Sequence, residues 1–413
     1  MKKYNFIDLF AGCGGLSEGF LQTNKFNALS HVEWELPMIS TLRHRLVEKW
    51  KHSMNDSYKK VIHFDLQKTE ELLNGNWSKE SFDSYSSTND VKLSFKGMDG
   101  IVGDEKVDLI IGGPPCQAYS IHGRATDKNS MDNDYRNYLF ESFVKIVNHY
   151  KPKIFVFENV PGMLSAKPGG VKITERIYQA FRDIGYNILE PEKLSQAVFD
   201  TSNFKVPQNR KRVILVGLPS DSKIKLQEVY SKIRFKEDIT NKLTVYDAIG
   251  DLPKLYPLEK PMKIDGKNFS HTYDNSVIPN HIPRFHNSRD IEIFREWVGN
   301  NMNNYSQHQK IEYYYQKTNK STLYSKYKNL EWKKQSQTVV AHLEKDGLMF
   351  IHPDAEQARS ITVREAARLM TFPDDFKFIG STAKCYKMIG NAVPVNFAKI
   401  IATSISEILD EKS

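Results

Sequence analysis

Cysteine is scarce in this chain of 413 residues, which contains three, namely Cys13, Cys116 and Cys385. No pair has the CxxC spacing, so we expect neither a zinc site nor a disulfide framework, and no metal. No apolar run approaches the roughly 20 residues that a membrane-spanning helix needs, and the segment MKKYNFIDLF lacks the apolar region and cleavage site of a signal peptide. These absences predict a cytoplasmic protein with no membrane partner.

Acidic residues are fewer than basic ones, 50 against 58, which gives a formal net charge of +8. This excess favours a polyanionic partner, first a nucleic acid and second an anionic membrane surface. An ordinary basic soluble protein is equally compatible with the charge alone. The hydrophobic content of 40% allows a sizeable core, and the length favours one large domain with a smaller one.

Apolar runs of strand length alternate with helical patterns through the first half of the chain. We predict strands at residues 4–10, 27–35, 60–67, 107–113, 153–160 and 211–219, and helices near 15–20, 36–50, 137–150 and 172–186. This alternation predicts an α/β fold with a doubly wound, mostly parallel, Rossmann-like sheet. Residues 69–103 are polar, and we interpret them as an inserted surface excursion.

The composition changes after Asp251, where Pro, Asn, Lys and Tyr become frequent. We therefore predict three segments: a catalytic domain at residues 1–251, a smaller irregular domain at 252–357, and a return segment at 358–413 that completes the first domain. Thr362 is a plausible helix N-cap, and Glu365 three residues later completes a capping box. The chain then ends in an amphipathic helix.

A glycine turn, Gly12, Gly14 and Gly15, follows the first predicted strand and lets backbone N–H groups approach a ligand. About 20 residues on, Glu33 ends the second strand, where a carboxylate can accept both hydroxyls of a ribose. Trp34 offers a flat face, and Asp65 could hold the amino group of an adenine. The set suits an adenosine-containing cofactor, although each acid alone could be a solvated strand end.

Cys116 follows a buried strand and two prolines in VDLIIGGPPCQAYS. A lone cysteine is usually a small buried hydrophobic residue. Here Pro114 and Pro115 stiffen the turn and fix the direction of the thiol, and a thiolate is an effective nucleophile. We therefore predict that Cys116 is a nucleophile and interpret the thiols of Cys13 and Cys385 as structural.

Glu158 ends the next strand and should lie near Cys116, because parallel strands end at one edge of a sheet. A carboxyl group there could bind a ring nitrogen and an exocyclic amine of a base, or it could simply cap the following turn. Arg210 and Arg212 alternate at the start of a strand and share a face. They could bind phosphate or a substrate carbonyl, or form a solvated basic edge.

Taken together, these motifs resemble those of the DNA cytosine-5 methyltransferases. The chain contains, in the order of that family, DLFAGCGG, GGPPCQAYS, FENVPGML, QNRKR, RSITVREAARLMTFPDDF and GNAVP, from residue 8 to about residue 400. Tyr119, Met370 and Val395 depart from the commoner pattern, where phenylalanine, glutamine and proline are usual. None of these departures removes a catalytic group.

The resemblance implies that the enzyme methylates C5 of a cytosine flipped out of duplex DNA, with S-adenosylmethionine as donor and S-adenosylhomocysteine as product. Cys116 would attack C6, Glu158 would bond N3 and the amino group, and Arg212 with Arg210 would hold the substrate. The residues implied for the cofactor site are Phe10, Gly12, Cys13, Gly15, Glu33, Trp34, Asp65, Leu66, Pro115, Asn391 and Val393.

Residues 252–357 would then form the target-recognition domain. The implied contacts with double-stranded DNA are Gln117 and Ser120 in the catalytic loop. Arg284, His286, Asn287 and Arg289 are further candidates for DNA contact, and they are equally compatible with ordinary polar residues of the surface. The segments NHIPRFHNSRD and AHLEKDG resemble those of members that methylate sites of the GGNCC sort. The resemblance also implies a monomer near the nucleoid that modifies DNA beside a cognate restriction endonuclease, without a stable complex.

Three other functions remain to be weighed. The tRNA-acting branch of the same family carries a Cys-Phe-Thr signature in its smaller domain, which this sequence lacks. A nicotinamide or flavin oxidoreductase would use the glycine turn but would leave Cys116, Glu158 and Arg212 unexplained together. A catalytically silent DNA-binding protein would be expected to lack Cys116 or Glu158, and both are present.

Overall fold

The computed structural model describes residues 2–90, 92–115, 139–272 and 278–412, which form two compact units. The first unit contains Met1–Phe204, Arg210–Ile239 and Val393–Ser413, and the second contains Lys205–Asn209 and Thr240–Ala392. The segments 1–251, 252–357 and 358–413 stay a prediction of functional domains. In the division by contacts, residues 240–251 and 358–392 lie in the second unit.

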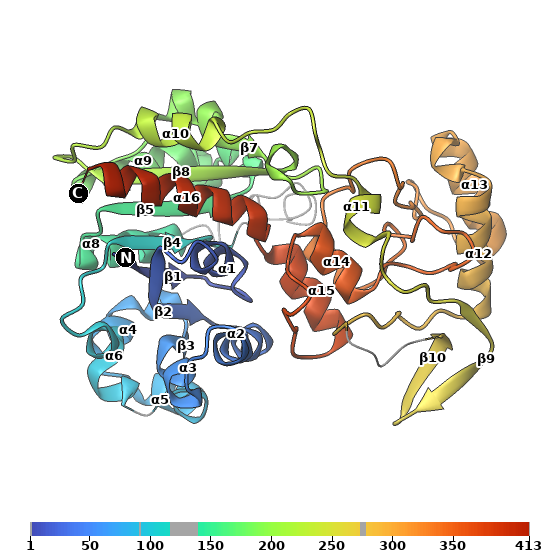
Figure 1. Cartoon of the computed structure of the whole chain (residues 1–413), viewed down its shortest axis with the longest axis horizontal. Helices are drawn as coiled ribbons and strands as arrows, with labels where there is room; N and C mark the ends of the chain where they lie inside the picture. Colours follow the sequence, from blue (N-terminus) through green and yellow to red (C-terminus); the bar gives the residue numbers. More distant parts are fainter. Residues whose placement is uncertain (1, 91, 116–138, 273–277, 413) are drawn as a thin grey trace. The chain divides into compact units, whose positions relative to one another are not determined.

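An eight-stranded sheet forms the centre of the first unit (Figure 1). Its strands, in spatial order, are β3 (Val61–His63), β2 (Phe26–Glu33), β1 (Tyr4–Leu9), β4 (Leu109–Gly112), β5 (Ile154–Asn159), β8 (Lys211–Pro219) and β6 (Tyr186–Asn187), with β7 (Val198–Asp200) also paired to β8. The first five are parallel, and β8 is antiparallel to its neighbours. The predicted α/β fold with a mostly parallel sheet is confirmed.

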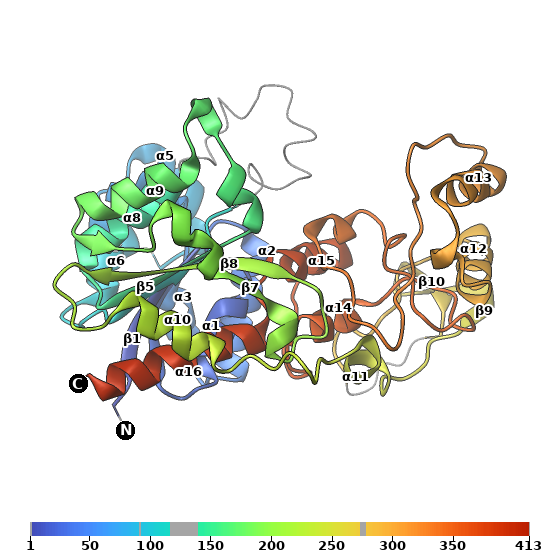
Figure 2. The same ribbon diagram turned by 90° about the horizontal axis from the view of Figure 1, so that it is seen from above.

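Helices cover both faces of this sheet, so its parallel strands are buried and apolar. On one face lie α1 (Gly15–Leu21), α10 (Leu226–Arg234) and α16 (Val395–Glu411), and on the other α8 (Leu139–Tyr150) and α9 (Ile173–Asp183) (Figure 2). Gly19 lets α1 and α16 meet closely, since a Cβ there would lie 2.6 Å from the backbone nitrogen of Lys399. After β2, the chain forms α2 (Leu36–Glu48) and α3 (Met54–Lys60).

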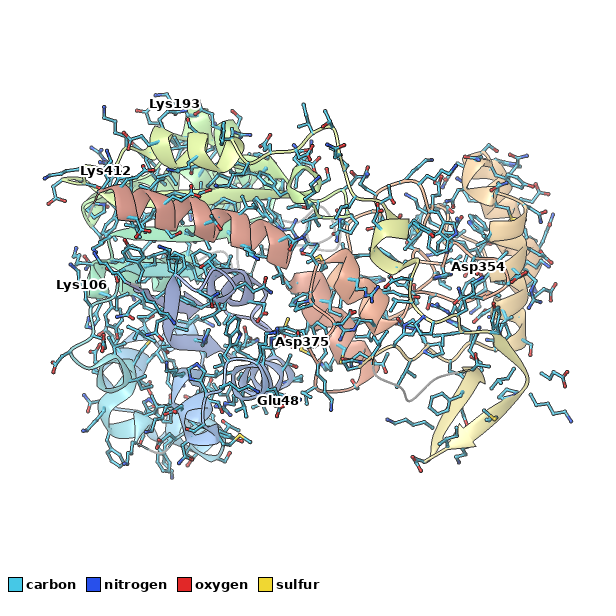
Figure 3. The ribbon with its side chains drawn as sticks, in the orientation of Figure 1. Glu48, Lys106, Lys193, Asp354, Asp375 and Lys412 are labelled. Atoms are coloured by element: carbon cyan, nitrogen blue, oxygen red, sulfur yellow. The ribbon has the colours of Figure 1, made fainter. Side chains whose placement is uncertain are left out.

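Charged side chains lie on the outside of the first unit. Lys106, Lys193 and Lys412 are exposed and point away from the ribbon (Figure 3). The basic excess found in the composition is therefore accessible to solvent at these positions.

The segment interpreted as a surface excursion is instead a helical layer. It contains α4 (Thr69–Asn74), α5 (Lys79–Tyr85) and α6 (Leu93–Val102), and α4 packs against α6. Leu72, Leu73 and Met98 are buried between these helices and their neighbours. The polar composition of residues 69–103 concealed this core, because short helices need only a few apolar side chains on their inner face.

The second unit contains short helices, a hairpin and long connections. Its elements are α11 (Val245–Ile249), β9 (Pro257–Ile264), β10 (Lys267–His271), α12 (Ser288–Gly299), α13 (Gln307–Thr318), α14 (Val363–Leu369) and α15 (Thr382–Asn391). Trp297 and Phe294 of α12 pack with Tyr327 and Ile351 in a small apolar core.

A buried ion pair lies at the start of α14. Two guanidinium nitrogens of Arg359 each donate to a carboxylate oxygen of Glu365 over 2.7 Å, and both side chains are about 1% exposed. Burial opposes ionisation of Glu365, but the Arg359 charge outweighs it and lowers the pKa. The predicted capping box is confirmed, because Glu365 N donates to Thr362 Oγ1 and Thr362 N donates to Glu365 Oε2.

One helical stretch, Thr382–Glu411, is long and apolar enough by composition to cross a membrane. In the structure 67% of its most apolar window is buried inside the protein, as in the core helix of a globular fold. The stretch comprises α15 and α16, which meet at residues 392–394.

We predict that the free energy of unfolding falls as the pH drops below about 6.5. Burial lowers the pKa of His271 to about 4, and those of His286 and His352 to about 3. Below pH 6.5 these histidines are protonated in the unfolded chain but stay neutral in the folded one. Each therefore lowers the free energy of unfolding by about 1.4 kcal/mol per pH unit until the pH reaches its pKa in the folded state. Glu365 adds to this loss only below about pH 4.5, its ordinary pKa.

Thermal unfolding from pH 8 to pH 4 measures this dependence. His271→Gln should reduce the slope of the free energy of unfolding against pH by the contribution of one proton. The exposed His308 provides the control, and His308→Gln should leave the slope unchanged. An unfolding curve that is flat between pH 6.5 and 5 would contradict the prediction.

Candidate active site

The order of the strands reverses between β1 and β4. The chain continues from β1 to β2 and β3 on one side of the sheet, and from β4 to β5 on the other. The two strands pair in parallel, with Leu9 opposite Gly112. Ligands of open α/β sheets bind beyond the carboxyl ends of the strands at such a reversal. The segments Phe10–Gly14 and Gly113–Pro115 therefore leave the sheet side by side at the expected site.

The glycine turn after β1 is left-handed at three positions. Phe10, Gly12 and Gly14 have φ values of 58°, 57° and 90°. Glycine adopts this conformation freely, whereas Phe10 does so at an energetic cost that is frequent in functional sites. Gly14 N donates to Ala11 O over 2.9 Å and closes the turn. Cys13 contributes its backbone to the turn, while its side chain is buried.

Glu33, at the end of β2, holds this turn in place. Gly12 N donates to Glu33 Oε2 over 2.8 Å, and the backbone nitrogens of Trp34 and Glu35 both donate to Oε1 over 2.9 Å. Burial raises the pKa of Glu33, and these three bonds oppose that rise. Of the roughly four lone-pair sites of a carboxylate, the remaining one is on Oε2, where it can accept a ligand hydroxyl.

The neighbouring strand ends supply a flat face and a second acid. Trp34 is 50% exposed, although large aromatic side chains are usually buried. Asp65 follows β3, is partly exposed, and accepts Gln67 N at Oδ1 over 2.9 Å, while Leu66 beside it is buried. An exposed indole and two carboxylates next to a glycine turn fit the base and ribose of an adenosine.

Glu158 and Arg212 form the second half of the site. Arg212 Nε lies 2.7 Å from Glu158 Oε1, and both side chains are nearly buried. β5 and β8 pair with Glu158 opposite Ile214, so Arg212 is its diagonal neighbour. Among the described residues Glu158 Oε2 has no hydrogen-bond partner. A Cβ at Gly113 would lie 2.6 Å from that oxygen, so the free oxygen lies beside the strand end that leads to Cys116.

The motif QNRKR connects the two units along the chain. Gln208 and Asn209 belong to the second unit and Arg210 to the first. In the second unit, Gln208 Nε2 donates to Leu369 O over 3.1 Å, and its Oε1 accepts Val339 N over 2.9 Å. In the first unit, Arg210 is buried directly before β8.

The remaining predicted residues are placed as follows. Cys116, Gln117 and Ser120 lie outside the described residues, and Pro115, partly buried, is the last described residue before Cys116. Val393 is buried in the first unit, whereas Asn391 is exposed at the end of α15 in the second.

Several predicted DNA contacts have structural partners in the second unit. Arg284 Nη2 donates to Leu343 O over 2.6 Å, and the guanidinium lies 4.7 Å from the Tyr386 ring centre. Asn287 caps α12 by accepting Asp290 N, and His286 is buried. Arg289 and Asn287 are both exposed, and Arg289, about half exposed, pairs with its neighbour Asp290.

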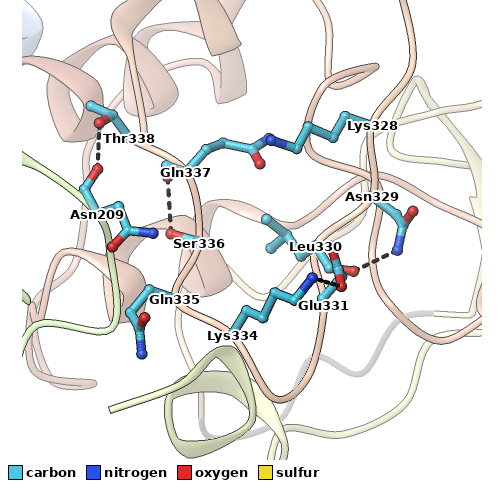
Figure 4. Close-up of a pocket in the computed structure, with 10 residues that line it drawn as sticks. All are labelled: Asn209, Lys328, Asn329, Leu330, Glu331, Lys334, Gln335, Ser336, Gln337 and Thr338. Carbon is cyan, nitrogen blue, oxygen red and sulfur yellow. Dashed lines mark hydrogen bonds and ion pairs between the residues drawn. The ribbon is translucent and has the colours of Figure 1, made fainter. Parts of the chain in front are cut away.

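A pocket of about 510 Å³ opens in the second unit, mostly in a segment that no motif marks (Figure 4). Its lining residues are Asn209, Lys328, Asn329, Leu330, Glu331, Lys334, Gln335, Ser336, Gln337 and Thr338. Glu331, its one carboxylate, already pairs with Lys334. The ammonium group of Lys328 and the side-chain amide of Asn209 have no partner among the described residues, which leaves donors for an anion. The absence of acidic residues between Glu312 and Glu331 could have indicated this basic region.

Within the described part of the chain, no group of three His, Cys, Asp or Glu side chains is placed to hold a metal. Burial raises the pKa of the Cys385 thiol to about 11, which makes it a poor nucleophile at neutral pH.

Solved structures of methyltransferases share the fold of this chain. A protein described as a DNA modification methyltransferase of an Escherichia coli prophage has a TM-score of 0.59 at 23% identity, covering 99% of this chain and 100% of its own. The S. pombe Dnmt2 methyltransferase has a TM-score of 0.52 at 16% identity, covering 100% of both chains. At these identities the likeness establishes the fold alone.

Sequence comparison identifies the family. Residues 4–76 and 63–407 match the C-5 cytosine-specific DNA methylases, and the chain belongs to this family. The Type II methyltransferase M.Bpa9945I of Bacillus paralicheniformis is 36% identical over 98% of this chain and 99% of its own length. M.PspPI of a Psychrobacter species, also a Type II methyltransferase, is 29% identical over 99% of this chain and 80% of its own. The protein is thus a DNA cytosine-5-methyltransferase, as the sequence motifs predicted.

We predict that Gly113→Ala lowers kcat about 100-fold, the cost of moving a reacting group by about 1 Å. The new methyl group would displace the Glu158 carboxylate, from which it would lie 2.6 Å. Methyl transfer to DNA measures the loss, and thermal unfolding checks that the variant folds. Gly299→Ala is the control, because a Cβ there meets nothing within 4 Å. Equal activity of the Gly113→Ala variant and the parent would show that this close approach does not matter.

Proposed function

We propose that this methyltransferase transfers a methyl group from S-adenosylmethionine to C5 of a cytosine flipped out of a specific double-stranded DNA sequence. The observation that carries the proposal is that Glu158 Oε2 has no hydrogen-bond partner among the described residues. It lies beside Gly113, three residues before Cys116, while Arg212 holds the other oxygen. A nucleophile and a carboxyl group at the same edge of a sheet suit a reaction in which the nucleophile adds to a pyrimidine ring while the carboxyl group bonds to that ring.

Cytosine C5 is a weak nucleophile until another group adds to C6. In the proposed reaction the Cys116 thiolate forms a bond to C6, and the C5–C6 π electrons make C5 nucleophilic. C5 then bonds to the methyl group as the bond between that methyl group and the donor sulfur breaks. Transfer of the C5 proton to solvent water restores the C5–C6 double bond as the C6–S bond breaks and the thiolate leaves. Pro114 and Pro115 limit the directions in which the following thiol can point.

Glu158 and Arg212 stabilise the ring as it gains electrons. Oε2 of Glu158 would exchange a proton with N3, and the carboxyl group would also accept a hydrogen bond from the exocyclic amino group. Arg212 keeps the carboxylate oriented through the 2.7 Å contact. Arg212, with Arg210 beside it in sequence, supplies positive charge for the ring carbonyl and the adjacent phosphate. These contacts strengthen in the transition state, which is where they accelerate the reaction.

The cofactor site is proposed at the ends of β1, β2 and β3. When bound there, S-adenosylmethionine would supply an electrophilic methyl group, and the product would be S-adenosylhomocysteine. The Trp34 face would stack on the adenine, Glu33 Oε2 would accept a hydrogen bond from a ribose hydroxyl, and Asp65 would accept one from the adenine amino group. The other proposed residues are Phe10, Gly12, Cys13, Gly15, Leu66, Pro115, Asn391 and Val393.

We propose that residues 252–357 recognise the DNA target. The net charge of +8 supports phosphate contacts, and Arg289 is accessible. Gln117 and Ser120 belong to the segment that follows Cys116 and would contact the flipped base or the gap that it leaves, while Arg284 and Asn287 would act near the DNA through the loop that they order. The cellular setting proposed is the cytoplasm, at the nucleoid, where a monomer modifies the sites of a cognate restriction endonuclease without binding it.

Transfer of a tritiated methyl group from S-adenosylmethionine tests the reaction. We expect label in 5-methylcytosine of DNA and none in tRNA. Cys116→Ser should abolish turnover and keep cofactor binding, because serine is a far weaker nucleophile. Cys385→Ser is the matched control and should retain turnover. A duplex containing 5-fluorocytosine should form a covalent adduct with the parent and none with Cys116→Ser. Label confined to RNA, or found in N6-methyladenine, would overturn the proposed function.

The pocket of the second unit gives a separate prediction about DNA binding. Lys328→Gln should weaken binding of all DNA sequences alike and reduce the slope of log K against log salt by about 0.9, the loss of one phosphate contact. Titration of labelled duplex between 50 and 200 mM salt measures this slope. Lys223→Gln removes the same charge from an exposed position of the first unit and should leave the slope unchanged. Equal slopes for the two variants would exclude a phosphate at Lys328.

A further inference from the structure

The hairpin β9–β10 is a free-standing element of the second unit. Within the described part of the chain the two strands pair only with each other, antiparallel, with Ile264 opposite Lys267 and Lys263 opposite Asn268 (Figure 1). Asp265 and Gly266 connect them with φ values of 48° and 78°. Two positive φ angles define the tight turn that matches the twist of a hairpin.

Only the base of the hairpin is buried. Phe269, Ser270 and His271 lie in the interior, and the ring of His271 contacts Gln357 O at 3.0 Å. Ser270 Oγ accepts His286 N over 2.9 Å. At the tip, residues 259–263 and 265–268 are all exposed. The hairpin is thus firmly anchored at one end and open to solvent on both faces at the other.

A two-stranded hairpin is only marginally stable in water, so an exposed one of this length calls for a partner. The chain belongs to a family that acts on DNA. The major groove of B-DNA is about 12 Å wide and admits a two-stranded ribbon, whose strands are about 4.8 Å apart.

Several exposed side chains of the tip are of the types that read base edges. Lys263 and Asn268 are opposite one another on one face of the ribbon, while Lys260 and Lys267 lie on the other. Lysine donates to guanine O6 and N7, and asparagine pairs with adenine N6 and N7. Three lysines against Glu259 and Asp265 give the hairpin a net positive charge.

Other partners fit this surface less well. Pro261, in the middle of β9, has no N–H to offer to an added strand, which disfavours extension of the sheet by another chain. Met262 is the one large hydrophobic side chain exposed among the described residues of the tip. A single such residue is too little for the apolar centre of a protein–protein interface.

We infer that the β9–β10 hairpin enters the major groove and that Lys263 and Asn268 read base pairs of the target sequence. The inference rests on the proposed function, since it concerns how this methyltransferase selects its cytosine. The hairpin is a recognition element and takes no part in the methyl transfer itself.

The test compares discrimination among DNA sequences. The target sequence is first obtained by mapping 5-methylcytosine in the DNA of cells that express the protein. The ratio kcat/KM is then measured for the target duplex and for duplexes with one changed base pair. For Lys263→Ala and Asn268→Ala we expect about a tenfold loss of discrimination at one or two positions, and full discrimination elsewhere. Both side chains are exposed, so the melting temperature should not change.

Lys223→Ala is the matched control and should keep the discrimination of the parent. Unchanged discrimination in both hairpin variants would overturn the inference while leaving the proposed function intact. A uniform loss of activity on all duplexes would also overturn it, because that result indicates phosphate contacts. A parent protein that methylates no duplex would overturn the proposed function and the inference together.

Discussion

The parallel pairing of β1 with β4, at the point where the strand order reverses, is the constraint on which the rest of the molecule depends. With Leu9 opposite Gly112, the glycine turn and the GGPP segment must leave the sheet side by side. The next strand, β5, pairs with β4 and places Glu158 beside Gly113. The register of the sheet therefore brings together groups that lie far apart in the sequence. A slip of one residue in the strand pairing would turn each side chain to the other face and separate these groups.

The second unit depends on a different interaction, the buried pair of Arg359 and Glu365. A buried ion pair is retained only where hydrogen bonds satisfy it. Here Gln357 supplies such a hydrogen bond. Its Oε1 accepts a hydrogen bond from Arg359 and another from Leu255 N. The carbonyl of Gln357 contacts His271 at the base of the hairpin. The same polar network thus completes α14 and anchors the element that we assign to DNA recognition.

Pattern recognition succeeded where local rules dominate. Buried parallel strands are continuous apolar runs, so β1, β4 and β5 were all predicted close to their observed positions. The capping box of Thr362 and Glu365 depends on four consecutive residues and was also predicted. The helical layer at residues 69–103 was missed, because its few buried leucines are dispersed among polar residues. The boundaries predicted at 251 and 357 rest on composition, which does not report which segments pack together.

By itself the sequence determined the class of the protein and the chemical groups that its site can use. These groups are a thiol after two prolines, a glutamate at a strand end, and arginines at alternate positions. These follow from residue type and spacing along the chain. Only the tertiary structure decided that Arg212 contacts Oε1 of Glu158, that Arg284 orders a loop, and that the β9–β10 tip is exposed on both faces. Hydrogen-bond partners and burial depend on residues that are distant in sequence, and folding alone brings them into contact.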